Sequence, residues 1–305
     1  MEKQRKDNLY GSFLLMLCAV IWGSSFVAQT TGAEFVGPFT FITMRSLLGS
    51  AALLPVIGVT GALKKKKTGS NKMTADEKKL LLKGGVACGV VLCFASNLQQ
   101  LGIDGGTEPG RAAFITALYI LLVPVFSLFL GKKIRPLIWP CVIVSVIALY
   151  LLCVKEGGRT QFSDLYVLLC ALCYTVHILV IDKVSPKVDG VTLSMLQFLV
   201  AGIISAVPML LFEEVTVENL IKAAPSIAYS GIMSSGVAYT LQILGQQKTE
   251  PTIATMIMSL ESVFGVLTAM VILHQIPSVR EAIGCILMFA AIIVAQLPEK
   301  KKIRI

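Results

Sequence analysis

The stretch PGRAAFITALYILLVPVFSLFL, residues 109–130, contains one charged residue, Arg111, in its 22 positions. A helix needs about 20 consecutive, mostly apolar residues to cross the hydrocarbon core of a bilayer. The stretch lacks the strict alternation of apolar and polar residues that is typical of a strand in a membrane barrel. It therefore predicts a helix that spans a membrane.

Nine other stretches of the chain have a similar length and character. The ten expected spans cover residues 10–30, 38–58, 80–102, 109–130, 136–154, 163–182, 190–212, 225–246, 251–273 and 279–297. Of the 305 residues, 55% are hydrophobic and only 15% are charged, and a soluble fold of this length cannot bury so much apolar surface. The composition excludes disordered chains, secreted disulfide scaffolds and nucleic-acid-binding modules. It predicts an all-α polytopic membrane protein with ten transmembrane helices.

Lysine and arginine residues are concentrated in alternate connections between the expected spans. The two termini and the connections that follow spans 2, 4, 6 and 8 hold 21 of them, including Lys64–Lys67, and the other connections hold 5. Because cytoplasmic connections carry the excess of positive charge, both termini are expected in the cytoplasm, as an even number of spans also requires. The first apolar run follows Lys3, Arg5 and Lys6 and is too long for a cleaved signal peptide. We therefore expect a multi-pass protein of the cell membrane that keeps its first helix.

The second half of the chain repeats the first with an offset of 152 residues, which becomes 142 because the connection after the seventh span is shorter. Residues related by these offsets are called equivalent below. The equivalent pairs are Cys18 and Cys170, Trp22 and Tyr174, Ser25 and His177, Arg45 and Gln197, Gln100 and Gln242, Thr107-Glu108-Pro109 and Thr249-Glu250-Pro251, and Ala117-Leu118-Tyr119 and Ser259-Leu260-Glu261. We expect two units, residues 1–154 and 155–305. Since each has five spans, the second unit enters the membrane from the opposite side, an arrangement that supports alternating access.

Four short motifs carry a resemblance to a known family. They are WGSSF at 22–26, FITMR at 41–45, AAFITALY at 112–119 ahead of Pro124, and SLE at 259–261. In this order and spacing, they resemble the EamA-type branch of the drug/metabolite transporter superfamily over nearly the whole chain. The resemblance implies ten helices in two inverted five-helix repeats, a central cavity, and transport, often export, of small metabolites. The chain departs from the family pattern at Ser262, Gly131-Lys132 and Leu273-His274, so roles tied to those positions are not carried over.

Few ionisable residues lie deep in the expected spans, where a charge is costly unless it faces a cavity or a partner. Glu261, near the middle of the ninth span, is a candidate for proton coupling, and a static hydrogen-bond anchor between helices is the alternative. His177 is a second candidate for coupling because imidazole titrates near neutral pH, and a His that is only hydrogen-bonded is the alternative. Arg45 has a planar fork suited to a carboxylate or phosphate of the substrate. Its alternatives are pairing with Glu261 or a side chain directed outward to the interface.

Polar and aromatic residues on facing helices form the expected substrate site. Together with Arg45, the candidates are Trp22, Ser25, Gln100, Tyr119, Tyr174, Gln197, Tyr239 and Gln242. Trp22, Ser25 and Gln29 share one face of the first span by their spacing, and Tyr174 and His177 lie on the equivalent face of the sixth. A few polar anchors in an apolar pocket suit an amphipathic small molecule. Ordinary aromatic packing is the alternative for each residue.

The sequence contains no motif of a catalytic or nucleotide-binding site. It lacks a phosphate-binding loop and the HEXXH and GXSXG patterns, so no enzyme activity, cofactor or metal is expected and a gradient is the expected energy source. Cys170 and Cys173 form a C-x-x-C pair without further ligands nearby and are expected to pack between helices. The expected partners are a small-molecule substrate and the lipid bilayer, without nucleic acid, and the oligomeric state and substrate identity are left open. A membrane receptor or scaffold that binds without turnover is the alternative function.

Overall fold

The computed structural model describes residues 2–68, 73–107, 109–154, 161–272 and 278–297. All regular structure in these residues is helical. The elements are α1 (Glu2–Ala33), α2 (Pro38–Thr68), α3 (Ala75–Asp104), α4 (Pro109–Thr116), α5 (Tyr119–Phe129), α6 (Ile138–Cys153), α7 (Ser163–Val184), η1 (Ser185–Lys187), α8 (Gly190–Phe212), α9 (Val217–Ala228), η2 (Tyr229–Ala238), α10 (Tyr239–Gln246), α11 (Pro251–Met258), α12 (Glu261–Ile272) and α13 (Val279–Ala295). Glu108 of the repeated motif and Leu273-His274 lie outside the described residues.

The helices follow the expected spans, but not every span is one long helix. Within the described ranges, seven segments are long and apolar enough to cross a bilayer: Lys6–Ala33, Pro38–Lys66, Ala75–Asp104, Arg111–Phe129, Ser163–Lys187, Gly190–Phe212 and Pro251–Thr268. The span expected at 136–154 is the shorter apolar helix α6, and the one at 279–297 is the 17-residue α13. The span at 225–246 is divided among α9, the π-helix η2 and α10. The all-α membrane class is confirmed, and the count of ten spans stays a prediction.

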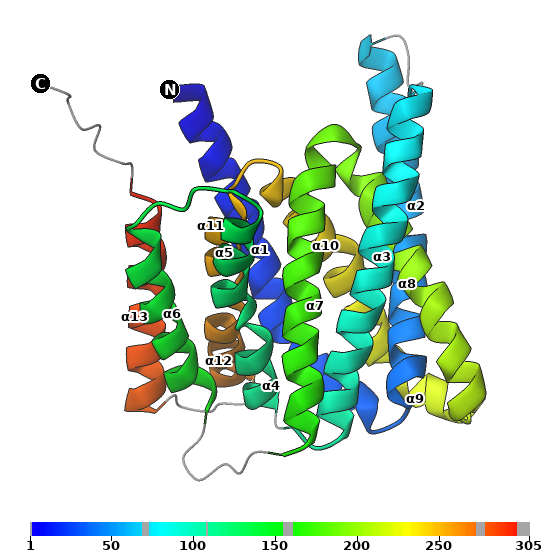
Figure 1. Ribbon diagram of the computed structural model, residues 1–305. Helices are drawn as coiled ribbons and strands as arrows, with labels where there is room; N and C mark the ends of the chain where they lie inside the picture. Colours follow the sequence, from blue (N-terminus) through cyan, green and yellow to red (C-terminus); the bar gives the residue numbers. More distant parts are fainter. Residues whose placement is uncertain (1, 69–72, 108, 155–160, 273–277, 298–305) are drawn as a thin grey trace, which may run out of the picture.

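The two ends of the bundle differ in charge (Figure 1). α1 begins at the end of the bundle where α2 ends and α3 begins. Lys64–Lys66 near the end of α2 are exposed there, and we call this the lysine-rich end. Lys248 pairs with Asp7 at 2.7 Å, so the connection after α10 also lies there. Arg111 pairs with Asp164 at 3.1 Å at the opposite end, where α4 and α7 begin. Basic connections that are far apart in the sequence thus share one end.

The most extensive helix contacts join the two expected units rather than helices within one unit. α2 packs along α8, α3 along α7 and α8, and α6 along α13. Figure 1 shows α6 and α13 side by side at one edge of the bundle. α2 and α8 are equivalent in the repeat, and so are α6 and α13. Helices at equivalent positions of the sequence repeat thus pack on each other.

Two of the expected spans are interrupted at equivalent positions. α4 gives way to α5 after Thr116, and α11 gives way to α12 after Met258, 142 residues later. In each interruption a backbone N–H bonds to the carbonyl three residues earlier, at 3.2 Å for Leu118 and 3.1 Å for Leu260. Backbone hydrogen bonds continue through both positions, for example from Ala117 N–H to the Ala113 carbonyl and from Ser259 N–H to the Thr255 carbonyl, so each interruption is a short tightening of the helix within one span.

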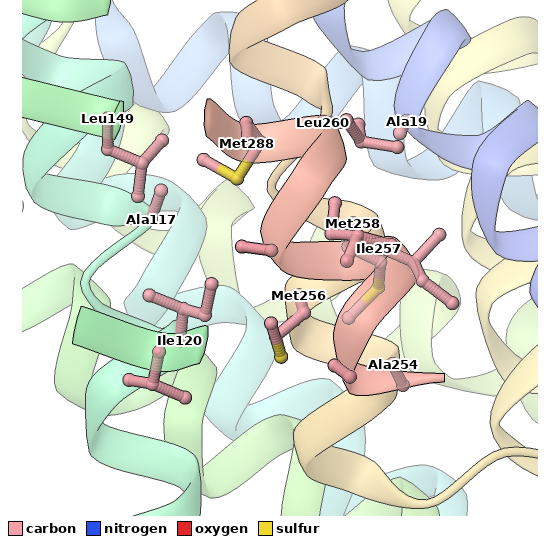
Figure 2. Close-up of a cluster of buried hydrophobic side chains, with 14 of the residues drawn as sticks. Ala19, Ala117, Ile120, Leu149, Ala254, Met256, Ile257, Met258, Leu260 and Met288 are labelled. Atoms are coloured by element: carbon pink, nitrogen blue, oxygen red, sulfur yellow. The ribbon is translucent and has the colours of Figure 1, made fainter. Parts of the chain in front are cut away.

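The largest apolar core surrounds α11 and the first turn of α12 (Figure 2). Met256 and Met258 of α11 are fully buried among Leu149 of α6, Met288 of α13 and Ala19 of α1. Flexible methionine side chains fill irregular gaps, and small residues such as alanine let membrane helices approach closely. This packing holds the interrupted segment that leads to Glu261.

Candidate functional site

A cavity lies between the middle of the bundle and the end opposite the lysine-rich end. Its walls enclose about 490 Å³, part of it open to solvent. It is lined by Trp22, Ser25, Phe26, Gln29, Arg45, Gln99, Thr116, Tyr119, Tyr174, Ile178, Ser234, Tyr239, Gln242, Met258 and Glu261. Both expected units contribute, so the cavity lies between them. Only about 40 Å³ of it is wide enough to admit the centre of a water molecule, so the cavity is narrow.

Arg45 is held at the cavity by two serines of the π-helix. Its Nε donates to Ser235 Oγ at 3.2 Å, and its Nη2 donates to Ser234 Oγ at 3.0 Å. In the described chain these bonds, rather than an ion pair with Glu261, orient the guanidinium. π-helical segments are often found at functional sites. Arg has five N–H donors, so these two bonds leave others for an anionic group in the cavity.

Glu261 and Tyr119 contact each other at the centre of the bundle. Tyr119 is the first residue of α5 and Glu261 is the first residue of α12, and the two positions are equivalent. The Tyr119 hydroxyl donates to Oε1 of Glu261 at 3.3 Å, and both residues are buried. Both residues line the cavity, and each belongs to a different expected unit. The carboxyl group is therefore placed where both units border the cavity.

Three aromatic residues form one wall of the cavity. The rings of Trp22 and Tyr239 meet edge to face with centroids 4.7 Å apart. The Tyr239 hydroxyl donates to the Tyr174 hydroxyl at 3.1 Å. Trp22 and Tyr174 are equivalent residues, so Tyr239 lies between a matching pair from the two units. The wall offers apolar ring surface next to hydroxyl groups.

Three buried polar atoms on residues that line the cavity have no hydrogen-bond partner in the described part of the chain. They are Nε1 of Trp22, Oγ of Ser25 and Oε1 of Gln242. A buried polar group without a partner costs free energy, so these atoms are available to bind water or a small molecule. They provide an indole donor, a hydroxyl and a carbonyl acceptor.

Eight of the eleven predicted site residues line this cavity, and Gln100, His177 and Gln197 do not. His177 and Gln197 are fully buried and bonded to each other, with His177 Nε2 and Gln197 Oε1 2.9 Å apart. Gln100 is fully buried, and neither atom of its amide has a partner among the described residues. The roles assigned to all eleven residues stay predictions.

Several lining residues were not among the predicted candidates. They are Phe26, Gln29, Gln99, Thr116, Ile178, Ser234 and Met258. Gln29 was already placed on the face of Trp22 and Ser25 by its spacing. Gln99 Nε2 donates to Thr116 Oγ1 at 3.0 Å, a contact that joins α3 to the interruption after α4. Nothing in the sequence marks Ser234 as a residue of the cavity, because a serine in an apolar span does not reveal a π-helix.

The cysteines are unpaired thiols, and Cys170 and Cys173 of the C-x-x-C pair are buried and half-buried. Among the described residues, no group of three or more His, Cys, Asp or Glu side chains is arranged to hold a metal ion.

Comparison with known proteins adds to this geometry. The family model for EamA-like transporters matches residues 9–154 and again residues 161–296. This chain belongs to the EamA-like transporter family. The resemblance carried by the sequence motifs is thereby confirmed, and this EamA-like transporter is a multi-pass membrane protein of the drug/metabolite transporter superfamily.

One relative of this EamA-like transporter is an "Uncharacterized transporter" from Archaeoglobus fulgidus. The two are 26% identical over 293 residues, which cover 95% of this chain and 87% of the relative. A solved crystal structure is 18% identical in sequence and superposes with a TM-score of 0.74 over 94% of this chain and 96% of the other. That similarity establishes the fold.

Proposed function

We propose that this EamA-like transporter is a secondary active carrier that moves a small amphipathic molecule across the cell membrane by alternating access. The proposal includes ten membrane-spanning helices in two inverted five-helix units, residues 1–154 and 155–305, with both termini in the cytoplasm. The family resemblance favours export as the direction. A gradient supplies the energy, since the sequence has no phosphate-binding loop for ATP.

The equivalence of the two units is supported by contacts that occur twice. Thr107 Oγ1 donates to Ser163 Oγ at 2.8 Å, and the equivalent Thr249 lies directly against the equivalent Gly11. The interruptions after α4 and α11 also match. The turn between α3 and α4 thus packs onto α7, the first helix of the second unit. The turn between α10 and α11 packs in the same way onto α1, the first helix of the first unit. Units related in this way can exchange conformations, so that the closed end of one state becomes the open end of the next.

The observation that carries the proposal is the central cavity with polar groups of opposite character. Arg45 offers free N–H donors to an anionic group. Glu261 and the unpartnered carbonyl of Gln242 accept hydrogen bonds from a cationic or neutral donor, and Trp22 and Met258 offer apolar surface. A molecule that combines an acid, a donor and an apolar body fits this set. Amino acids and amphipathic drug-like compounds have these features.

Counterflow in proteoliposomes tests the proposal. The purified protein is reconstituted, loaded in turn with each member of a panel of unlabelled amino acids and amphipathic acids, and mixed with the same radiolabelled compound outside. A carrier accumulates label transiently above the level of protein-free vesicles, with and without an imposed pH gradient. Binding of a compound without any counterflow would contradict transport and indicate the alternative function, a receptor or scaffold without turnover.

A further inference from the structure

One pair of residues in the first unit faces the cavity, whereas the equivalent pair in the second unit does not. The first pair is Ser25 and Arg45, and the second is His177 and Gln197. Ser25 and Arg45 line the cavity. His177 and Gln197 are each 0% exposed and bond to each other at 2.9 Å. One position of the repeat is therefore open to the cavity, and its counterpart in the other unit is closed on itself.

One close helix contact is common to the two pairs, although Gly231 lies in the π-helix η2 and the equivalent Gly89 lies in the α-helix α3. A Cβ atom at Gly231 would lie 3.0 Å from the carbonyl oxygen of Arg45. At the equivalent Gly89, a Cβ atom would lie 2.7 Å from the carbonyl oxygen of Gln197. In each unit, a glycine of one helix thus lets the helix that carries the polar residue approach closely. The close approach of the helix that carries Arg45 thus has a counterpart at Gln197, whereas the serines that bind Arg45 are replaced by Leu92 and Cys93 at the equivalent positions.

Buried polar atoms without partners gather around the closed pair. Nδ1 of His177, Nε2 of Gln197 and Oγ of Ser194 have no partner among the described residues, and all three residues are 0% exposed. Ser194 precedes Gln197 by three positions on α8, so the two share a face. Within a membrane, such groups are retained where water or a ligand reaches them in some state of the protein.

The cluster lies next to residues that line the cavity, since the rings of His177 and Tyr239 meet edge to face with centroids 6.2 Å apart. Gln242 lines the cavity, and Gln246 lies one turn further along α10 toward the lysine-rich end. Nε2 of Gln246 donates to the carbonyl of Ile178 at 3.3 Å, and Ile178 also lines the cavity. Oε1 of Gln246 has no partner in the described chain. Gln246 is thus bonded to the backbone of the residue that follows His177.

We infer that His177, Ser194 and Gln197 form a second, inner substrate position, which the His177–Gln197 hydrogen bond closes in this state. The inference rests on the proposed function. When the outer position closes, this pair separates and the three side chains face a cavity open to the cytoplasm. They offer uncharged donors and acceptors, whereas the outer position offers the Arg45 guanidinium. The acidic group of the substrate is therefore held less tightly at the inner position than at the outer one.

Thiol labelling tests this position without a known substrate. In a Cys-free background, Ser194→Cys, Ser25→Cys and Leu193→Cys are each treated with a membrane-impermeant maleimide in right-side-out and inside-out vesicles. We expect Ser194→Cys to react only from the cytoplasmic face and Ser25→Cys only from the outer face. Leu193→Cys is the matched control, because Leu193 is the fully buried apolar neighbour of Ser194 and is expected to stay inert on both faces.

A second variant tests the closure itself. Gln197→Leu removes the bond to His177, so labelling of Ser194→Cys from the cytoplasmic face is expected to become about two- to tenfold faster, the range for one net hydrogen bond. Labelling of Ser194→Cys from the outer face, or inertness on both faces while Ser25→Cys reacts, would overturn the inference. Counterflow of a radiolabelled amino-acid mixture in the same vesicles distinguishes the two proposals. Counterflow with an inert Ser194→Cys contradicts the inner position alone, and labelling without counterflow contradicts transport alone.

Discussion

Arg45 and Gln197 occupy equivalent positions, so only one of the two carries a charge. The Arg45 guanidinium is fixed by Ser234 and Ser235, which lie about 190 residues further along the chain. A fixed, planar cation beside a cavity recognises carboxylate or phosphate by geometry as well as by charge. For the proposed substrate site, this asymmetry predicts that the two units bind the substrate unequally.

Arg45→Gln introduces the residue that the chain already has at the equivalent position. The affinity for an acidic substrate identified by counterflow is expected to fall by about 10- to 100-fold, as for the loss of a charged hydrogen bond. Arg45→Lys keeps the charge but not the fork, and its loss is expected to be smaller. Isothermal titration calorimetry of each purified variant with the substrate measures both affinities. Equal affinity in Arg45→Gln and the unmodified protein would rule out contact between Arg45 and the substrate.

Glu261→Gln replaces the carboxyl at the centre of the bundle with a neutral amide that resembles its protonated form. Uptake driven by a pH gradient is expected to be abolished, and exchange of substrate is expected to persist in part, since exchange requires only that the loaded carrier reorients. Tyr119→Phe removes the hydrogen bond to Glu261 but keeps the titrating group, so it is expected to retain gradient-driven uptake. Wild-type gradient-driven uptake in Glu261→Gln would eliminate Glu261 as the coupling group. Loss of both activities together with loss of folded protein would point to a static anchor.

The interrupted and π-helical elements are the parts of the fold that the sequence does not reveal. Ten apolar stretches are readable because each is long enough to cross a bilayer. The interruptions at 117–118 and 259–260 contain no proline or glycine, so they depend on packing between the units. The π-helix η2 (Tyr229–Ala238) likewise has only glycine and serine as hints. For this reason, Trp22, Arg45 and Glu261 were placed by spacing and charge, whereas Ser234 was found only in the structure.

The contact between α2 and η2 depends on Gly49. A Cβ atom there would lie 2.7 Å from Cβ of Ser235 and 2.8 Å from the carbonyl oxygen of Gly231. Gly49→Ala is therefore expected to cost about 1–3 kcal/mol of stability, as overpacking does, and to weaken binding at Arg45. Gly58→Ala is the matched control on the same helix, because nothing lies within 4 Å of its Cβ position. Thermal unfolding in detergent compares them, and equal melting temperatures would show that the contact tolerates a methyl group.

At the scale of the whole molecule, the repeat was readable from the sequence, but the way the units interlock was not. The offsets of 152 and 142 follow from matched motifs such as Thr107 and Thr249. They do not reveal that α6 pairs with α13 or that Tyr119 touches Glu261, because sequence similarity carries no information on which equivalent segments meet. These contacts come from the folded arrangement.

The charge distribution makes a prediction about the orientation of the whole bundle. Both termini and the segment Lys64–Lys67 are expected in the cytoplasm, because connections rich in lysine and arginine are retained there. Alkaline phosphatase, which is active only outside the cytoplasm, is fused after residue 305 and, separately, after residue 35. The first fusion is expected to be inactive and the second active. Activity of the first fusion would refute the number of spans or their orientation.

The bonds of Arg45 to Ser234 and Ser235 also bear on how the protein is made. The ribosome must add about 190 residues after Arg45 before its partners exist, which takes roughly 10–40 s at about 5–20 residues per second. During that interval Arg45 is in the membrane without the serines that later bind its guanidinium. α6 likewise lacks its packing partner α13. The first half of the chain therefore depends on the insertion machinery, or on water that remains around Arg45, until the second half arrives. Correct assembly of this transporter therefore requires that the first half of the chain stays protected in the membrane until the second half has been synthesised.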